Sequence, residues 1–183
     1  MSGDVTVISG PTAVGKGTVV RALKARHPAV WVSVSATTRS PRPGEIDGEH
    51  YWFLSDAAFD TLLAADGLLE WAVVHGRDRY GTPAAPVLEA LERGERVILE
   101  IDLQGARQVR HKLPRARLVF IAPPSWDELV SRLVGRGTET AEQRERRLVT
   151  ARAELAAADE FDHVVVNDQL GRAVDDLVSL LGL

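Results

Sequence analysis

The chain of 183 residues contains no cysteine, no long apolar run and no excess of basic residues. Without cysteine it forms no disulfides, thiol nucleophiles or cysteine-bound metal sites, and it suits a reducing compartment, so we expect a cytoplasmic protein. No apolar run approaches the roughly 20 residues that span a bilayer. The Met-Ser-Gly-Asp start shows no basic segment followed by an apolar stretch, so no signal peptide is expected. The net charge of −4 argues against general nucleic-acid binding.

The composition that is present, 45% apolar and 26% charged, is that of an ordinary globular protein, and the length fits one domain. Short β-branched or apolar runs predict strands at 5–9, 30–35, 51–54, 68–75, 97–101, 118–122 and 163–166. Helical patterns and capping residues predict helices at 16–26, 55–65, 82–94, 171–181 and two that begin near 125 and 140. This alternation predicts an α/β fold with a parallel sheet and helices on both faces.

Two segments are read as insertions on that core. Residues 35–83 are rich in polar residues, and residues 125–148 are dense in charge. The expected core therefore comprises residues 1–34, 84–124 and 149–183.

A glycine-rich loop follows the first strand and reads GPTAVGKGT at residues 10–18. Backbone N–H groups of such a loop converge on phosphate oxygens, and Lys16 can reach the outer phosphates of a nucleoside triphosphate. The strict P-loop pattern has Ser or Thr after the lysine, whereas this chain has Gly17 and then Thr18. The alternative is a structural turn with a surface lysine. The predicted ATP-binding residues of the loop are Gly10, Pro11, Thr12, Ala13, Val14, Gly15, Lys16, Gly17 and Thr18.

The segment 35–54, SATTRSPRPGEIDGEHYWFL, together with the P-loop, resembles the guanylate kinases. Further matching blocks lie at 68–76, 80–82, 98–106, 136–139 and 164–168. The resemblance implies a P-loop NTPase-like fold, with 35–83 as a nucleoside-monophosphate-binding insertion and 125–148 as a helical lid. It also implies transfer of the γ-phosphoryl group of ATP to GMP, giving ADP and GDP, in purine nucleotide metabolism and GMP recycling. Mg²⁺ is the implied cofactor.

The resemblance also implies how GMP is held. Its phosphate is assigned to Ser35, Arg39, Arg42 and Tyr51, with Tyr80 completing the site. Guanidinium forks suit a phosphate monoester, although arginines in loops are usually solvated. Glu70 is assigned to guanine, whose ring N–H and amino group match one carboxylate, and Thr82 can add a hydroxyl. The alternative for Glu70 is an exposed strand position.

One stretch departs from the family pattern. Guanylate kinases usually have a shorter Gly-Asn-x-Tyr-Gly link, whereas this chain reads GRDRYG at residues 76–81. The extra residue bears directly on the position of Tyr80.

The resemblance places Asp102 between the two nucleotides, where it can act on metal-bound water, on Lys16 or on the acceptor. Thr18 is a possible metal ligand, with Mg²⁺ held largely by water and phosphate. Arg136 and Arg147 match catalytic lid arginines, and Arg132 is expected as a third. Asn167 is assigned to adenine. For each arginine the alternative is a solvated charged face.

Two other functions stay open at this point. One is a non-catalytic module that binds protein partners; the other is a kinase for a different phosphorylated small molecule, such as a ribosyl bisphosphate. The expected ligands are ATP and GMP, with dGMP as a second acceptor, and neither nucleic acid nor membrane is an expected partner. The sequence leaves the oligomeric state open.

Overall fold

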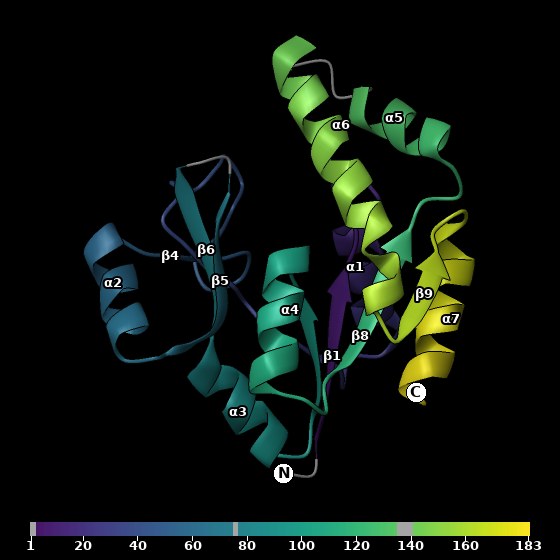
Figure 1. Ribbon diagram of the computed structural model, residues 1–183. Helices are drawn as coiled ribbons and strands as arrows, with labels where there is room; N and C mark the ends of the chain where they lie inside the picture. The colour runs from purple at the N-terminus through teal and green to yellow at the C-terminus, as the bar shows by residue number, and fades with distance from the viewer. Residues whose placement is uncertain (1–2, 75–76, 135–140) are drawn as a thin grey trace. The chain divides into compact units, whose positions relative to one another are not determined.

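The computed structural model of the protein describes residues 3–74, 77–134 and 141–183 (Figure 1). Its strands are β1 (Asp4–Ser9), β2 (Trp31–Val32), β3 (Ala36–Thr37), β4 (Trp52–Phe53), β5 (Leu68–Val74), β6 (Asp78–Pro83), β7 (Arg96–Glu100), β8 (Arg117–Ala122) and β9 (His163–Val166). Its helices are α1 (Lys16–Arg26), α2 (Asp56–Ala64), α3 (Ala84–Glu92), α4 (Leu103–Lys112), α5 (Trp126–Val134), α6 (Ala141–Ala156) and α7 (Leu170–Leu181), with a 3₁₀ turn at Ala158–Glu160.

Five strands form a parallel sheet in the order β2-β7-β1-β8-β9. The apolar runs of β1, β7 and β8 are almost wholly buried, as expected for strands covered on both faces. The predicted α/β fold, a parallel sheet flanked by helices, is therefore confirmed.

By its internal contacts the chain divides into two compact units. The first comprises Met1–Val5, Val30–Leu99 and Gln104–Ala116, and the second comprises Thr6–Ala29, Glu100–Leu103 and Arg117–Leu183. In the second unit, α7 packs against α1 and β9, and α5 lies beside α6 (Figure 1).

The first unit contains a second sheet, in the order β4-β3-β6-β5, that the sequence did not predict. Strand β6 pairs antiparallel with both β3 and β5. Phe59 of α2 packs beneath this sheet, fully buried with Ala36 and Leu68. The small core explains how strands as short as β3 and β4 are held.

Three local predictions were wrong. The single strand expected at 30–35 is divided: the N–H of Ser33 donates to Ile98 in one sheet, and the carbonyl of Ser35 accepts from Trp52 in the other. Thr82 is not a helix cap, because it lies in β6 and α3 begins two residues later. Helix α4 was missed, since only a narrow stripe of small or β-branched side chains is buried among its charged residues.

Within the described ranges, no helix is both long and apolar enough to cross a membrane.

Candidate functional site

The P-loop connects β1 to α1, and its backbone requires glycine at two places. Gly10 has a φ of 146°, and a Cβ there would lie 2.3 Å from the carbonyl oxygen of Ile121. Gly15 has a φ of 96° and forms the N-cap of α1, without a side chain over the helix end. No side chain at position 15 therefore covers the free amides of the first turn of α1.

Lys16 is folded back over this loop. Its Nζ donates to the carbonyl oxygens of Gly10, at 2.6 Å, and Pro11, at 3.2 Å. Burial lowers the pKa of Lys16, while the negative charges of nearby carboxylates act to raise it. In order of effect these carboxylates belong to Glu154, Glu100 and Asp102. The charges of three acidic groups thus act on the ammonium, and of these Glu154 was not predicted.

Glu100 lies beside the position where this loop departs from the strict pattern. A Cβ on Gly17 would be 3.3 Å and 3.5 Å from the two carboxylate oxygens of Glu100. Burial raises the pKa of Glu100, and the charges of Lys16 and Arg21 oppose that shift. The hydroxyl of Thr18 accepts a hydrogen bond from Arg21 at 3.4 Å. Glycine at position 17 therefore leaves room for a carboxylate where other P-loops carry a hydroxyl.

Two more predicted residues meet at the same loop. The side-chain amide of Asn167 donates to the carbonyl oxygen of Val14 at 2.8 Å. Arg132 of α5 donates to the same oxygen at 3.3 Å and to the carbonyl of Asn167 at 3.2 Å. The structure therefore brings Asn167, Arg132 and the P-loop together.

The other two arginines predicted for the lid lie farther along the chain. Arg147 is half-buried on α6, and Arg136 lies outside the described residues. We refer to the P-loop, Glu100, Asp102, Arg132, Glu154 and Asn167 as the donor cluster, all within the second unit.

A second group of residues, the acceptor cluster, consists of Arg39, Glu45, Tyr51 and Tyr80 in the first unit. Both terminal nitrogens of Arg39 bind the Glu45 carboxylate at 2.9 Å. Its Nε donates to the hydroxyl of Tyr80, also at 2.9 Å. The Arg39 guanidinium lies 5.4 Å from the centre of the Tyr51 ring, which meets Tyr80 edge-on. Three predicted phosphate ligands thus converge.

Glu45 is the residue of this cluster that sequence reasoning missed. Its hydrogen bonds from Arg39, and then from the backbone N–H of Arg42, lower its pKa to about 2. The Arg42 side chain is exposed, and Ser35 is half-buried at the end of the short β3–β4 pairing. The signal available in the sequence was an acid placed six residues after Arg39 in the same loop.

Glu70 and Thr82 face each other across β5 and β6. Glu70 is only 5% exposed, and Thr82 donates its hydroxyl proton to Glu70 at 2.6 Å. A Cβ on Gly105 of α4 would lie 2.5 Å from the other carboxylate oxygen. Because Thr82 and Tyr80 are two residues apart on β6, they lie on the same face of the sheet. The predicted guanine reader is therefore a buried carboxylate on the face that carries Tyr80.

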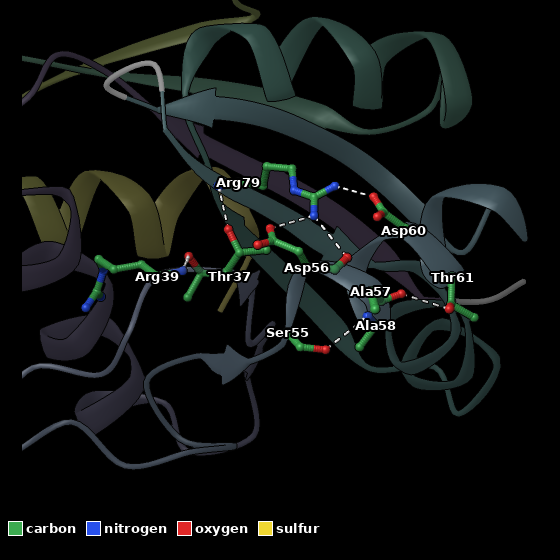
Figure 2. A network of polar contacts seen from close by, with 10 residues as sticks. Thr37, Arg39, Ser55, Asp56, Ala57, Ala58, Asp60, Thr61 and Arg79 are labelled. Atoms are coloured by element: carbon green, nitrogen blue, oxygen red, sulfur yellow. Dashed lines mark hydrogen bonds and ion pairs between the residues drawn. The ribbon is translucent and has the colours of Figure 1, made fainter.

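The link that departs from the family pattern is anchored by Arg79 (Figure 2). Its guanidinium binds Asp60 at 2.5 Å and the side chain of Asp56 at 2.7 Å, both on α2. It also lies 4.8 Å from the ring centre of Phe59. Arg79 thus joins β6 to α2. Its neighbour Tyr80 lies in the predicted phosphate site despite the longer link.

Known proteins resemble the chain over almost its whole length. The family model described as guanylate kinase matches residues 2–182. A guanylate kinase of Nocardia farcinica is 61% identical over 179 residues, which cover 97% of this chain and 93% of that protein. One of Streptomyces coelicolor is 60% identical over 176 residues, covering 96% of this chain and 89% of that protein.

Solved structures agree with these sequence matches. The crystal structure of guanylate kinase from Anaplasma phagocytophilum superposes with a TM-score of 0.80 at 30% identity, covering 99% of this chain and 85% of that one. Shikimate kinase from Bacteroides thetaiotaomicron, at 14% identity and a TM-score of 0.55 over 98% of this chain and 99% of that one, shares the fold. From the family match and the high identity to several of its members, the chain belongs to the guanylate kinase family.

Proposed function

We propose that the donor and acceptor clusters divide the guanylate kinase reaction between them. The chain transfers the γ-phosphoryl group of ATP to GMP and yields ADP and GDP. In this proposal residues 35–83 bind GMP, residues 125–148 act as the lid, and the rest of the chain forms the core. The buried Glu70–Thr82 pair carries the proposal, because a buried carboxylate is costly unless hydrogen-bond donors pair with it, and guanine offers two such donors.

Glu70 would read guanine. The ring N–H and amino group of guanine are two adjacent donors, and the Glu70 carboxylate offers two acceptor oxygens. Adenine lacks this pair of donors, so the Glu70 carboxylate would not gain the hydrogen bonds that guanine supplies, a loss that can reach about 10⁴-fold in specificity. Thr82 supports the role because its hydroxyl holds one oxygen of Glu70 in place.

The phosphate of GMP would bind at Arg39, Tyr51 and Tyr80. The fork of Arg39 already binds a carboxylate, Glu45, in two-point geometry, and a phosphate monoester presents the same pair of oxygens. Arg42 and Ser35 would add to this grip from the adjoining loop.

The triphosphate of ATP would bind the P-loop. The Lys16 side chain would then leave the carbonyl oxygens of Gly10 and Pro11 and bind the outer phosphates. Arg132, Arg136 and Arg147 would neutralise charge on the transferred group, which can supply about 10³-fold or more in rate. Asn167 lies at the end of β9 and would contact adenine. Closure of the lid would keep water from accepting the phosphoryl group.

A kinase that uses ATP generally requires a divalent cation, and we propose Mg²⁺. The carboxylates of Glu100 and Asp102 near Lys16 fit this hard cation, which prefers oxygen ligands and keeps several waters. Thr18 is a weaker candidate because its hydroxyl already accepts from Arg21. When bound, Mg²⁺ neutralises charge on the phosphate oxygens. Asp102 would orient water or Lys16 beside it.

The test is a coupled assay of GMP, AMP, UMP and TMP with Mg-ATP, run on the natural chain and on Glu70→Gln. GMP should be the preferred acceptor. In the variant, kcat/KM for GMP should fall at least about 10²-fold, because the amide presents a donor to a donor of guanine, while KM for ATP stays nearly constant. Glu89→Gln, an exposed position on α3 in the same unit, is the matched control.

Other outcomes would identify the competing functions. No turnover with any acceptor would favour a non-catalytic module, and turnover only with a sugar phosphate would favour the second kinase. Equal weakening of GMP and ATP binding by Glu70→Gln would remove Glu70 as the reader.

We also propose that dGMP is accepted, since none of the assigned contacts involves the 2′-hydroxyl. The reaction is proposed to take place in the cytoplasm, which suits a chain without cysteine.

A further inference from the structure

The carbonyl oxygen of Val14 in the P-loop accepts hydrogen bonds from two side chains that come from distant parts of the chain. The side-chain amide of Asn167 donates to it at 2.8 Å, and the guanidinium of Arg132 donates to it at 3.3 Å. Val14 is fully buried, and Asn167 is only 8% exposed. One donor would be enough to pair a buried carbonyl. A second donor fixes the direction of this carbonyl as well.

The two donors are themselves held in place. A second terminal nitrogen of Arg132 donates to the backbone carbonyl of Asn167 at 3.2 Å, so the two side chains and the loop close a ring of contacts. The backbone N–H of Asn167 donates to Ala122 of β8 at 2.8 Å. The Nε of Arg132 donates to Glu128, one turn earlier on α5, at 3.2 Å. The P-loop carbonyl is therefore tied both to the end of β9 and to α5.

Fixing this carbonyl also fixes the N–H group on the other side of the same peptide bond. The bond between Val14 and Gly15 is planar and trans, so its C=O and its N–H point in opposite directions. The Gly15 N–H belongs to the P-loop amides of the kind that bind phosphate oxygens. Asn167 also packs closely on Gly15, because a Cβ there would lie 2.8 Å from its side-chain nitrogen. Asn167 thus determines where this amide points.

We propose that Asn167 is a positioning residue for the donor phosphates: together with Arg132 it aims the Gly15 N–H at the phosphate site. This role is additional to the contact with adenine proposed above. It rests on the proposed function for the place of the triphosphate on the P-loop. The hydrogen bond from Asn167 goes to the loop and not to a nucleoside. The two roles therefore differ in what they predict for a ligand that has phosphates but no base.

The test compares Asn167→Ala and Asn167→Ser with Gln169→Ala, which removes an exposed amide two residues away that makes no capping hydrogen bond. Calorimetry measures the separate dissociation constants of inorganic tripolyphosphate, Mg-ADP and GMP. Tripolyphosphate and Mg-ADP should each bind the two Asn167 variants about three- to tenfold more weakly, the effect of one lost hydrogen bond. GMP, whose proposed residues lie in the other unit, should bind within about twofold of its natural affinity. Gln169→Ala should leave all three constants within the same limit.

Unchanged or tighter binding of tripolyphosphate by the Asn167 variants would overturn the inference. A loss confined to Mg-ADP would do the same, since Asn167 would then contact adenine alone, and so would an equal loss for GMP, which indicates general damage to the fold. The serine variant keeps a polar group that is too short to reach Val14, so it decides the matter if Asn167→Ala does not fold.

The outcome is separable from the proposed function. If the natural chain itself bound no tripolyphosphate, the P-loop would not be the phosphate site, and the proposed function would fail together with the inference. If the natural chain and the Asn167 variants bound tripolyphosphate equally well, only the inference would fail. None of these measurements requires transfer of a phosphoryl group, so they do not depend on the result of the coupled assay.

Discussion

At the scale of single residues, carboxylates lie at both proposed anion sites. Glu45 binds the fork of Arg39, and the charges of Glu154, Glu100 and Asp102 act on Lys16 of the P-loop. Glu45 thus pairs with Arg39 in the absence of nucleotide. With a pKa lowered to about 2, Glu45 adds stability that is present above its unfolded value and is lost only as the pH falls through about 2. It therefore remains an anion down to about pH 2.

Gly105 allows α4 to approach the proposed guanine reader. The side-chain amide of Gln108 binds the backbone of Trp71 at 3.1 and 2.8 Å, which holds α4 against β5. A Cβ at position 105 would lie 2.5 Å from the Glu70 carboxylate. Gly105→Ala should therefore displace Glu70 and raise KM for GMP about tenfold or more, with KM for ATP unchanged.

The matched control for this variant is Gly171→Ala in α7, where an added Cβ meets nothing within 4 Å. That variant should keep both KM values and gain up to about 1 kcal/mol in the free energy of unfolding. If Gly105→Ala left the kinetics of GMP unchanged, the close approach of α4 would have no part in substrate binding.

Lys16 is the residue whose loss should be most severe. Lys16→Ala removes the positive charge that would bind the outer phosphates of ATP, so kcat should fall at least about 10²-fold. Lys24→Ala, on the same helix but exposed, should stay near the natural rate. Near-normal turnover by Lys16→Ala in the coupled assay would remove the P-loop assignment.

At the scale of elements, the charged helix α6 has two distinct halves. Its last turns are anchored by buried Ala151, and Arg152 lies 4.8 Å over the ring of Trp126 on α5. Its earlier turns include the half-buried Arg147, one of the arginines of the proposed lid. In our proposal, α6 is anchored near its C-terminal end and brings Arg147 to the nucleotide.

Arg147→Ala should lower kcat about 10²- to 10³-fold, because its charge is needed on the moving phosphoryl group rather than for binding GMP. The dissociation constant of GMP, measured by calorimetry, should change less than about twofold. Arg146→Ala, at an exposed position paired with Glu142, is the control. A defect confined to nucleotide affinity would reassign Arg147.

The second prediction at this scale concerns the tie between β6 and α2. Arg79→Met keeps the stem that covers Phe59 but loses the bonds to Asp56 and Asp60. Amide hydrogen exchange in α2 should accelerate, and KM for GMP should rise a few-fold, about 1 kcal/mol in binding, because Tyr80 loses its anchored neighbour. Arg77→Met, in the same link, should do neither. Unchanged exchange in α2 would show that the ion pairs do not hold it.

At the scale of the whole molecule, the two proposed ligands have separate residues. The acceptor cluster and Glu70 lie in the first unit, and the donor cluster lies in the second. Substitutions in one set should therefore affect mainly the affinity for one nucleotide. The proposed chemistry requires both sets.

Metal dependence is a property of the complete reaction. Excess EDTA should reduce turnover at least about 10²-fold, and added Mg²⁺ should restore it, because the triphosphate charge is then neutralised. The control is the Glu70→Gln variant, assayed with and without EDTA. The metal should not alter which acceptor this variant prefers. Full activity of the natural chain in EDTA would exclude a metal-dependent mechanism.

The sequence by itself determined the elements and the motifs that local patterns encode. Buried apolar runs specified β1, β7 and β8, and the glycine spacing of residues 10–18 specified the P-loop, because each depends on neighbours in the chain. The assignment of Arg39, Tyr51 and Tyr80 to one place also came from the sequence, through the family pattern.

Only the tertiary structure decided which distant residues meet. Thr82 reads locally as a helix cap, yet its cross-strand neighbour Glu70 draws it into β6. Glu154 reads as one more acid on a charged helix, yet its charge acts on Lys16 from the other end of the chain. No local pattern carries such contacts, since the partners are brought together by packing of the core rather than by spacing along the chain.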